Sequence, residues 1–129
     1  MIVRNNSFAG GLLGTGGCGT IPNCRETSNL FGAGMYVNDS AGCTLDYNAY
    51  ANAQGALPGG ATPGSHPTYG AVPNWVNPSA SRPDLHLGVN STGVIDTGSP
   101  SPGDYASLDG DGISRPLGKA ADVGAYEKG

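Results

Sequence analysis

The chain has few basic residues and little charge of either sign, which excludes two classes of partner. Only 6 of the 129 residues are Lys or Arg, against 10 Asp or Glu, and the formal net charge is −4. A nucleic-acid-binding protein needs clustered cations to displace counterions from phosphates, and an anionic membrane surface makes the same demand. Because the basic residues are scattered along the chain, we expect neither partner.

Long apolar runs and helix signals are also missing. No stretch approaches the roughly 20 apolar residues that cross a membrane as a helix, and the opening segment MIVRNNSF lacks the apolar core of a secretory signal. Apolar residues at helical spacing are always interrupted by Gly or Pro. The sequence therefore predicts no membrane span, no signal peptide and little helix.

Cysteine is scarce, with three residues at positions 18, 24 and 43. Their spacing does not match a zinc site, which usually combines two close pairs of Cys or His. Cys18 and Cys24 flank the turn-rich segment GTIPN and are candidates for a disulfide, although three separate buried thiols fit equally well. Low charge with abundant Gly, Asn, Ser and Thr indicates an extracellular or cell-surface location, where such a disulfide would persist.

Glycine and proline are abundant, with 23 and 10 residues respectively. No strict triplet repeat is present, which excludes collagen, and the spread of aromatic residues with low charge argues against disorder. Short strand-like runs alternate with clusters of turn-forming residues. We expect a single all-β domain over residues 1–129.

Two strand-like runs, IVRNNSF at 2–8 and TLDYNAY at 44–50, resemble each other. Set in register, three pairs share a residue type: Val3 with Leu45, Asn6 with Asn48, and Phe8 with Tyr50. Stacked Asn amides can bond the backbone of a tight bend, and stacked aromatic rings can fill the interior of a β-solenoid. We therefore expect structural roles for Asn6 and Asn48.

The separation of the two similar runs fits either two repeats or one repeat with an insertion. We expect the β-helix coils to occupy residues 1–50, with a Gly-rich insertion at about 9–34. Residues 51–73 read as a long loop, and residues 74–129 as the C-terminal end and cap.

Four stretches of the chain carry a resemblance to a known family: LDYNAY (45–50), PNWVNPSASRPDLHL (73–87), TGVIDTGSP (92–100) and LDGDGISRPLGKAADVGAYE (108–127). Together they resemble the C-terminal end of secreted right-handed parallel β-helix proteins of the choice-of-anchor type, in the pectate-lyase-like superfamily. The resemblance implies a short right-handed parallel β-helix of few coils with a C-terminal cap. The sequence starts abruptly at MIVRNN, and we expect an open N-terminal end, on which upstream coils, another copy or a partner would stack.

The last of these stretches has a metal interpretation and a structural one. Asp109 and Asp111 alternate as at the start of an EF-hand loop. The later ligand and glycine positions are occupied by unsuitable residues: Ile113, Ser114 and Ala120. A Ca²⁺ ion on Asp109 and Asp111 stays an alternative, but we favour no cofactor and a structural Arg115 paired with Asp109, Asp111 or Asp122.

The resemblance also implies carbohydrate chemistry as an alternative function. A polysaccharide lyase needs a base and usually a cation, and a glycoside hydrolase needs two carboxyl groups. The weak candidates for catalysis are Arg4, Asp39 and Asp46. The candidates for contacts with a polysaccharide are Trp75, Tyr69 and His66.

Two functions remain open from the sequence. The first is a non-catalytic extracellular or cell-surface module that caps a solenoid and stacks with itself or a partner. The second is a fragment or small relative of a polysaccharide lyase or hydrolase that binds or cleaves glycan. We favour the first, because the catalytic candidates are too scattered to form a recognisable constellation.

Overall fold

The computed structural model describes residues 2–9, 12–14, 24–32, 36–38, 43–51 and 64–129. All regular structure within these residues is β, with no helix. The strands are β1 Ile2–Arg4, β2 Ser7–Phe8, β3 Leu12–Gly14, β4 Cys24–Thr27, β5 Leu30–Phe31, β6 Tyr36–Asn38, β7 Cys43–Asp46, β8 Ala49–Tyr50, β9 Thr68–Tyr69, β10 Trp75–Asn77 and β11 Asp84–Leu87. Because no described segment is helical, none forms an apolar helix that could cross a membrane.

Three parallel sheets are built from strands that recur along the sequence. Their orders are β1-β4-β7, β2-β5-β8-β9 and β3-β6. Only the hairpin of β10 and β11 is antiparallel among the named strands. The all-β class is confirmed, with parallel sheets. The described strands do not close into a solenoid, and a right-handed β-helix stays a prediction.

A middle repeat lies in the stretch where the sequence indicated an insertion. The strands β4 and β5, within residues 9–34, pair in register with the repeat before them and the repeat after them. The similar runs at 2–8 and 44–50 are therefore separated by a third run, RETSNLF at 25–31. Two repeats, rather than one repeat with an insertion, account for the separation.

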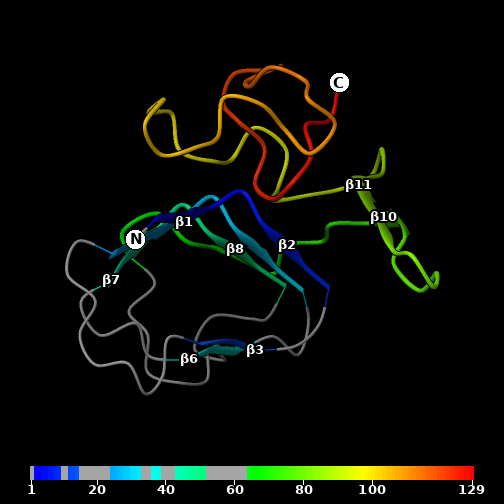
Figure 1. Ribbon diagram of the computed structural model, residues 1–129, viewed down its shortest axis with the longest axis horizontal. Helices are drawn as coiled ribbons and strands as arrows, with labels where there is room; N and C mark the ends of the chain where they lie inside the picture. Colours follow the sequence, from blue (N-terminus) through cyan, green and yellow to red (C-terminus); the bar gives the residue numbers. More distant parts are fainter. Residues whose placement is uncertain (1, 10–11, 15–23, 33–35, 39–42, 52–63) are drawn as a thin grey trace.

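The C-terminal segment lies beside the parallel sheets rather than over the end of the stack (Figure 1). Its last residues bond to successive repeats: the Ala125 N–H donates to Ser7 Oγ (3.0 Å), and the Gly124 N–H donates to the Ser28 carbonyl oxygen (2.9 Å). Gly124 has a φ of 104°, and a Cβ there would lie 2.6 Å from Ser7 Oγ. Only glycine allows this close approach.

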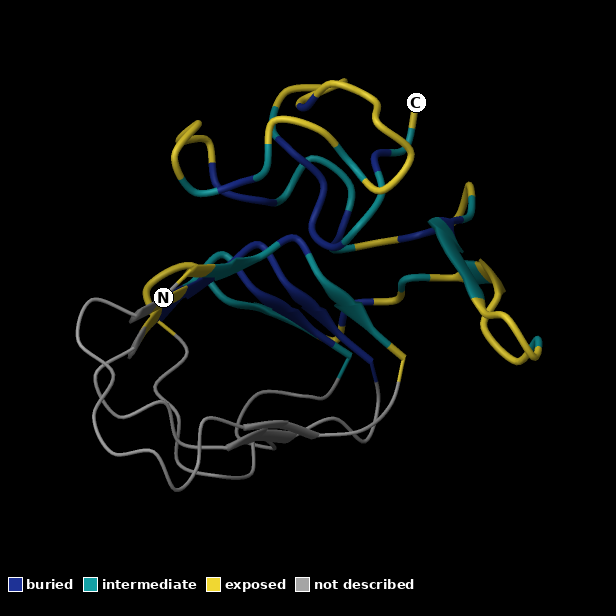
Figure 2. Cartoon of the chain, viewed as in Figure 1, coloured by how far each residue is buried: buried dark blue, intermediate teal, exposed yellow. Residues whose placement is uncertain are grey.

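The buried core lies between the sheet of β2, β5, β8 and β9 and the C-terminal segment (Figure 2). Its buried members are Leu30, Ala49, Ala71, Leu87, Val94 and Val123. Two partly buried side chains, Trp75 and Ile95, pack against this cluster. The segment that we expected to cap the stack thus covers one face of a sheet, because that face carries the apolar residues Leu30 and Ala49.

Candidate functional site

An asparagine ladder runs through the three repeats at the bend between the first two sheets. Asn29 Oδ1 accepts hydrogen bonds from the Asn6 N–H (3.1 Å) and from Asn6 Nδ2 (3.0 Å). Asn48 Oδ1 accepts the same two bonds from Asn29, at 2.9 and 3.1 Å. Each amide oxygen therefore binds the backbone and the side chain of the Asn in the preceding repeat.

The amide nitrogens of Asn29 and Asn48 also bond to the backbone of the preceding repeat. Asn29 Nδ2 donates to the Val3 carbonyl oxygen (3.1 Å), and Asn48 Nδ2 donates to the equivalent Glu26 carbonyl oxygen (2.8 Å). Asn29 and Asn48 are fully buried, so these bonds are made where water is excluded. Lost bonds at such sites leave unsatisfied polar groups, which are costly.

The residue before each ladder asparagine adopts the left-handed conformation. Asn5, Ser28 and Tyr47 have φ values of 52°, 54° and 52°. This conformation is unfavourable for residues other than glycine. The ladder bonds stabilise the bend that requires it.

An aromatic ladder accompanies the asparagines two residues further along each repeat. The Phe31 ring stacks on Phe8 with a centroid distance of 5.2 Å, and on Tyr50 at 5.2 Å. Tyr69, expected to contact sugar, is the last ring of this ladder, 5.7 Å from Tyr50. Phe31 and Tyr50 are buried, whereas Phe8 at the start of the ladder is only half-buried.

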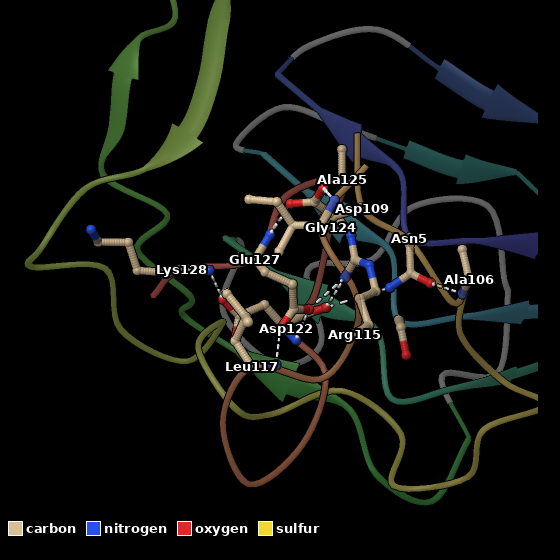
Figure 3. A network of polar contacts seen from close by, with 12 residues as sticks. Asn5, Ala106, Asp109, Arg115, Leu117, Asp122, Gly124, Ala125, Glu127 and Lys128 are labelled. Atoms are coloured by element: carbon tan, nitrogen blue, oxygen red, sulfur yellow. Dashed lines mark hydrogen bonds and ion pairs between the residues drawn. The ribbon is translucent and has the colours of Figure 1, made fainter. Parts of the chain in front are cut away.

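Arg115 lies at the centre of a second polar network, in the C-terminal segment (Figure 3). Its Nη1 donates to Glu127 Oε1 (2.8 Å) and to the Asp122 carbonyl oxygen (3.0 Å), and its Nη2 donates to the Gly124 carbonyl oxygen (2.9 Å). The side chains of Arg115 and Glu127 are 0% and 1% exposed. The ion pair of Arg115 is thus made with Glu127, not with the aspartates that the sequence indicated.

The Glu127 carboxylate also binds the backbone of its own segment. It accepts hydrogen bonds from the Asp122 N–H at 2.8 Å and from the Leu117 N–H at 3.0 Å. One buried ion pair therefore holds residues 115–127 in a closed loop. These contacts give the network a structural role.

Asp109 and Asp111, the candidate Ca²⁺ ligands, bind different partners. The Asp109 carboxylate accepts three backbone N–H bonds, from Asp111, Ile113 and Glu127, at 2.9, 2.8 and 3.0 Å. Burial acts to raise the pKa of Asp109, but these donors outweigh it and lower the pKa. Asp111 Oδ2 lies 2.7 Å from His86 Nε2. Within the described residues, no three His, Cys, Asp or Glu side chains are grouped as metal ligands.

Asp122 is a buried carboxylate whose ionisation opposes folding. Burial is the largest cause that raises its pKa to about 6, and the charge of Glu127 adds to it, against the Asp96 and Lys128 N–H donors. The ordinary value of 3.8 applies in the unfolded chain. Because the folded state holds the proton more tightly, stability is present at low pH and is lost as the pH rises from about 4 to about 6.

We expect this single group to lower the free energy of unfolding by up to about 3 kcal/mol between pH 4 and pH 7. Carboxyl-carbon NMR should show Asp122 titrating near pH 6, and thermal melts of Asp122→Asn should lose this part of the pH dependence. A carboxyl that titrates near pH 4 would contradict the prediction.

The structure brings together one catalytic candidate, Asp46, and one glycan-binding candidate, His66. Asp46 Oδ1 accepts the His66 N–H (2.8 Å), and Asp46 Oδ2 lies 3.1 Å from His66 Nδ1. The His66 ring also stacks on Tyr47 at 4.4 Å. Burial acts to raise the pKa of Asp46, but the bonds from His66 and Tyr47 lower it overall.

The other catalytic candidates do not join Asp46. Arg4 and Asp46 lie at equivalent positions of β1 and β7, and the buried Thr27 of β4 lies between the two residues. Two strand spacings amount to about 10 Å, and the Arg4 guanidinium donates to the Gly103 carbonyl oxygen at 2.9 Å. Asp39 lies outside the described residues.

Trp75 and the cysteines complete the residues singled out from the sequence. Trp75, the third glycan candidate, packs against the core cluster, and its ring tip lies 2.9 Å from where a Cβ of Gly32 would be. Cys18 lies outside the described residues, so the proposed bridge to Cys24 cannot be placed. The backbone of Cys24 pairs with that of Cys43 in adjacent strands.

Sequence reasoning missed two groups of residues. The first is the middle repeat, whose Asn29-Leu30-Phe31 segment carries the same Asn-x-aromatic signal as the two repeats that were recognised. The second is the contact of His86 with Asp84 (2.5 Å) and Asp111, with the His86 ring on Tyr126 at 3.9 Å. No sequence signal links His86 to Asp111, which lies 25 residues further along the chain, or to Tyr126.

Comparisons with known protein families, with curated proteins and with solved structures find no match to this chain.

Proposed function

We propose that the chain is a non-catalytic extracellular or cell-surface module, built as a short right-handed parallel β-helix, that stacks end-on with another β-repeat. One observation carries the proposal: among the strands that the structure describes, β1, β2 and β3 of the first repeat each lie at the edge of their sheet. The edge of a parallel sheet presents unpaired N–H and C=O groups that favour the addition of a further strand.

Three further features support parts of the proposal. Crossover connections between parallel strands are right-handed in about 98% of cases, which supports the handedness. The resemblance of the later stretches to choice-of-anchor β-helix proteins supports the module type. The low charge and the abundance of Gly, with 23 residues, support an extracellular setting.

A structural rather than catalytic role is also supported by the contacts of the catalytic candidates. The Asp46 carboxylate is occupied by bonds from His66, and Arg4 binds a backbone carbonyl oxygen. A general base or nucleophile must instead reach the substrate.

We expect no cleavage when the chain is incubated with acidic or neutral polysaccharides, measured as new reducing ends or unsaturated products. Asp46→Ala and the unmodified chain should give the same baseline. Product formed by the unmodified chain and lost in Asp46→Ala would contradict the non-catalytic role and favour a lyase or hydrolase that uses Asp46.

A further inference from the structure

In the part of the chain that the structure describes, both ladders end at the first repeat with unfilled positions. In each later repeat, the first residue of the β5, β8 or β9 strand donates its N–H to the carbonyl oxygen of the ladder Asn in the repeat before. These bonds join Leu30 to Asn6 at 2.8 Å, Ala49 to Asn29 at 2.9 Å, and Thr68 to Asn48 at 3.0 Å. The register places Ser7 at the equivalent position of the first repeat. The Ser7 N–H therefore points away from β5, toward where a preceding Asn carbonyl oxygen would lie.

The side chain of Asn6 shows the same incomplete pattern. Asn29 Oδ1 and Asn48 Oδ1 each accept two bonds from the preceding Asn, whereas Asn6 Oδ1 has no such partner within the described part of the chain. Asn6 Nδ2 also turns back to the Arg4 carbonyl oxygen of its own repeat (3.0 Å), where Asn29 and Asn48 reach into the repeat before.

Among the described rings, the aromatic ladder is open on the same side. Phe8 stacks on Phe31 with one face, and it is half-buried whereas Phe31 is 2% exposed. Three features thus define what would fit: a carbonyl oxygen for Ser7, an amide N–H pair for Asn6 Oδ1, and a ring for Phe8.

The last repeat of this same chain does not meet these requirements. The register that aligns Ala49 with Thr68 and Tyr50 with Tyr69 places Pro67 at the position of Asn48. Proline has neither a backbone N–H nor a side-chain amide. A head-to-tail copy could stack Tyr69 on Phe8, but it would bury Asn6 Oδ1 without a donor.

We infer that the open edge of the first repeat selects a parallel β-repeat that carries Asn two residues before an aromatic residue, and rejects this chain's own last repeat. This inference rests on the proposed stacking function. The unpaired Asn6 oxygen should weaken head-to-tail association about tenfold or more relative to an Asn-bearing partner.

The test fuses a copy of residues 24–42 directly before Met1 of the full chain. This copy is the second repeat. Cys24 pairs with Cys43 in the native register, so placing the copy directly before Met1 puts the copied cysteine in register with Met1. Matched fusions carry Asn29→Ala or Asn29→Pro in the copy alone, the latter imitating Pro67. Hydrogen exchange at the Ser7 amide and the melting temperature are measured for each fusion and for the unfused chain.

The Asn-bearing copy should slow exchange at Ser7 by about tenfold or more and raise the melting temperature by about 5 °C over the two variants. Adding Asn6→Ala should make the melting temperatures of the Asn-bearing and Ala-bearing fusions equal. A general stabilisation by the copy, which does not act through Asn6, would leave the difference between the two melting temperatures in place. The unfused chain should stay monomeric in sedimentation experiments.

The outcomes separate this inference from the function on which it rests. Equal protection of Ser7 by all three copies would overturn the selection for Asn while leaving stacking in place. Head-to-tail polymers of the unfused chain would also overturn the selection for Asn and leave the stacking function in place. A copy that protects nothing at Ser7 would overturn both the inference and the stacking function.

Discussion

Replacing Arg115 with leucine is expected to lower the free energy of unfolding by about 3–5 kcal/mol. The change leaves the buried Glu127 carboxylate without its cation and removes the hydrogen bonds that Arg115 donates to the carbonyl oxygens of Asp122 and Gly124. A buried, unpaired charge of this kind costs far more than the net value of the pair.

Urea denaturation of three further variants isolates the cause. Arg115→Lys keeps the charge but cannot make the planar fork, so it should recover only part of the loss. The double variant Arg115→Leu with Glu127→Leu should be less damaged than Arg115→Leu alone. Arg82→Leu, at an exposed position, should change stability by no more than about 0.5 kcal/mol. If Arg115→Leu matches this control, the network does not stabilise the fold.

Replacing Asn29 with alanine is expected to cost about 2–4 kcal/mol, because the amide makes four hydrogen bonds at the centre of the ladder. It accepts two from Asn6 and donates one each to Val3 and Asn48. The removal also leaves the Asn6 N–H without its acceptor.

Two other asparagines, one at the end of the ladder and one outside it, serve as controls for Asn29→Ala. Asn6→Ala, at the half-buried end of the ladder, should cost about 1 kcal/mol, and Asn90→Ala, at an exposed turn, should cost almost nothing. Thermal melts of the three variants should follow that order. Equal losses at Asn29 and Asn6 would show that the ladder does not act through burial.

Short strand-like runs separated by turn-forming residues were sufficient to predict the all-β class, and the Asn-x-aromatic pattern predicted the correspondence of the first and third repeats. It missed the second repeat for a physical reason. The interior position held by Val3 and Leu45 is occupied there by Glu26, which is 1% exposed. A charged residue at a buried position breaks the apolar pattern on which such comparisons depend. The unequal spacing of 23 and 19 residues between the ladder asparagines hides the repeat further.

The importance of Arg115 could be predicted from the sequence, but its partner could not. Asp109, Asp111, Asp122 and Glu127 all lie within reach along the chain, and spacing does not rank them. The choice depends on how residues 122–127 fold back, with Glu127 turned to the guanidinium and Asp111 turned to His86. Contacts between such distant residues are set by tertiary packing rather than by local sequence.

The lateral position of the C-terminal segment has a consequence for how the chain folds. Asn5 bonds to the Asp122 carbonyl oxygen and to the Ala106 N–H, which lie 117 and 101 residues further along the chain. Contacts of such long range slow folding, because a large loop must close before they form. During synthesis, the apolar face of Leu30 and Ala49 is not fully covered until Val123 has left the ribosome, so the nascent chain depends on protection from aggregation until that point.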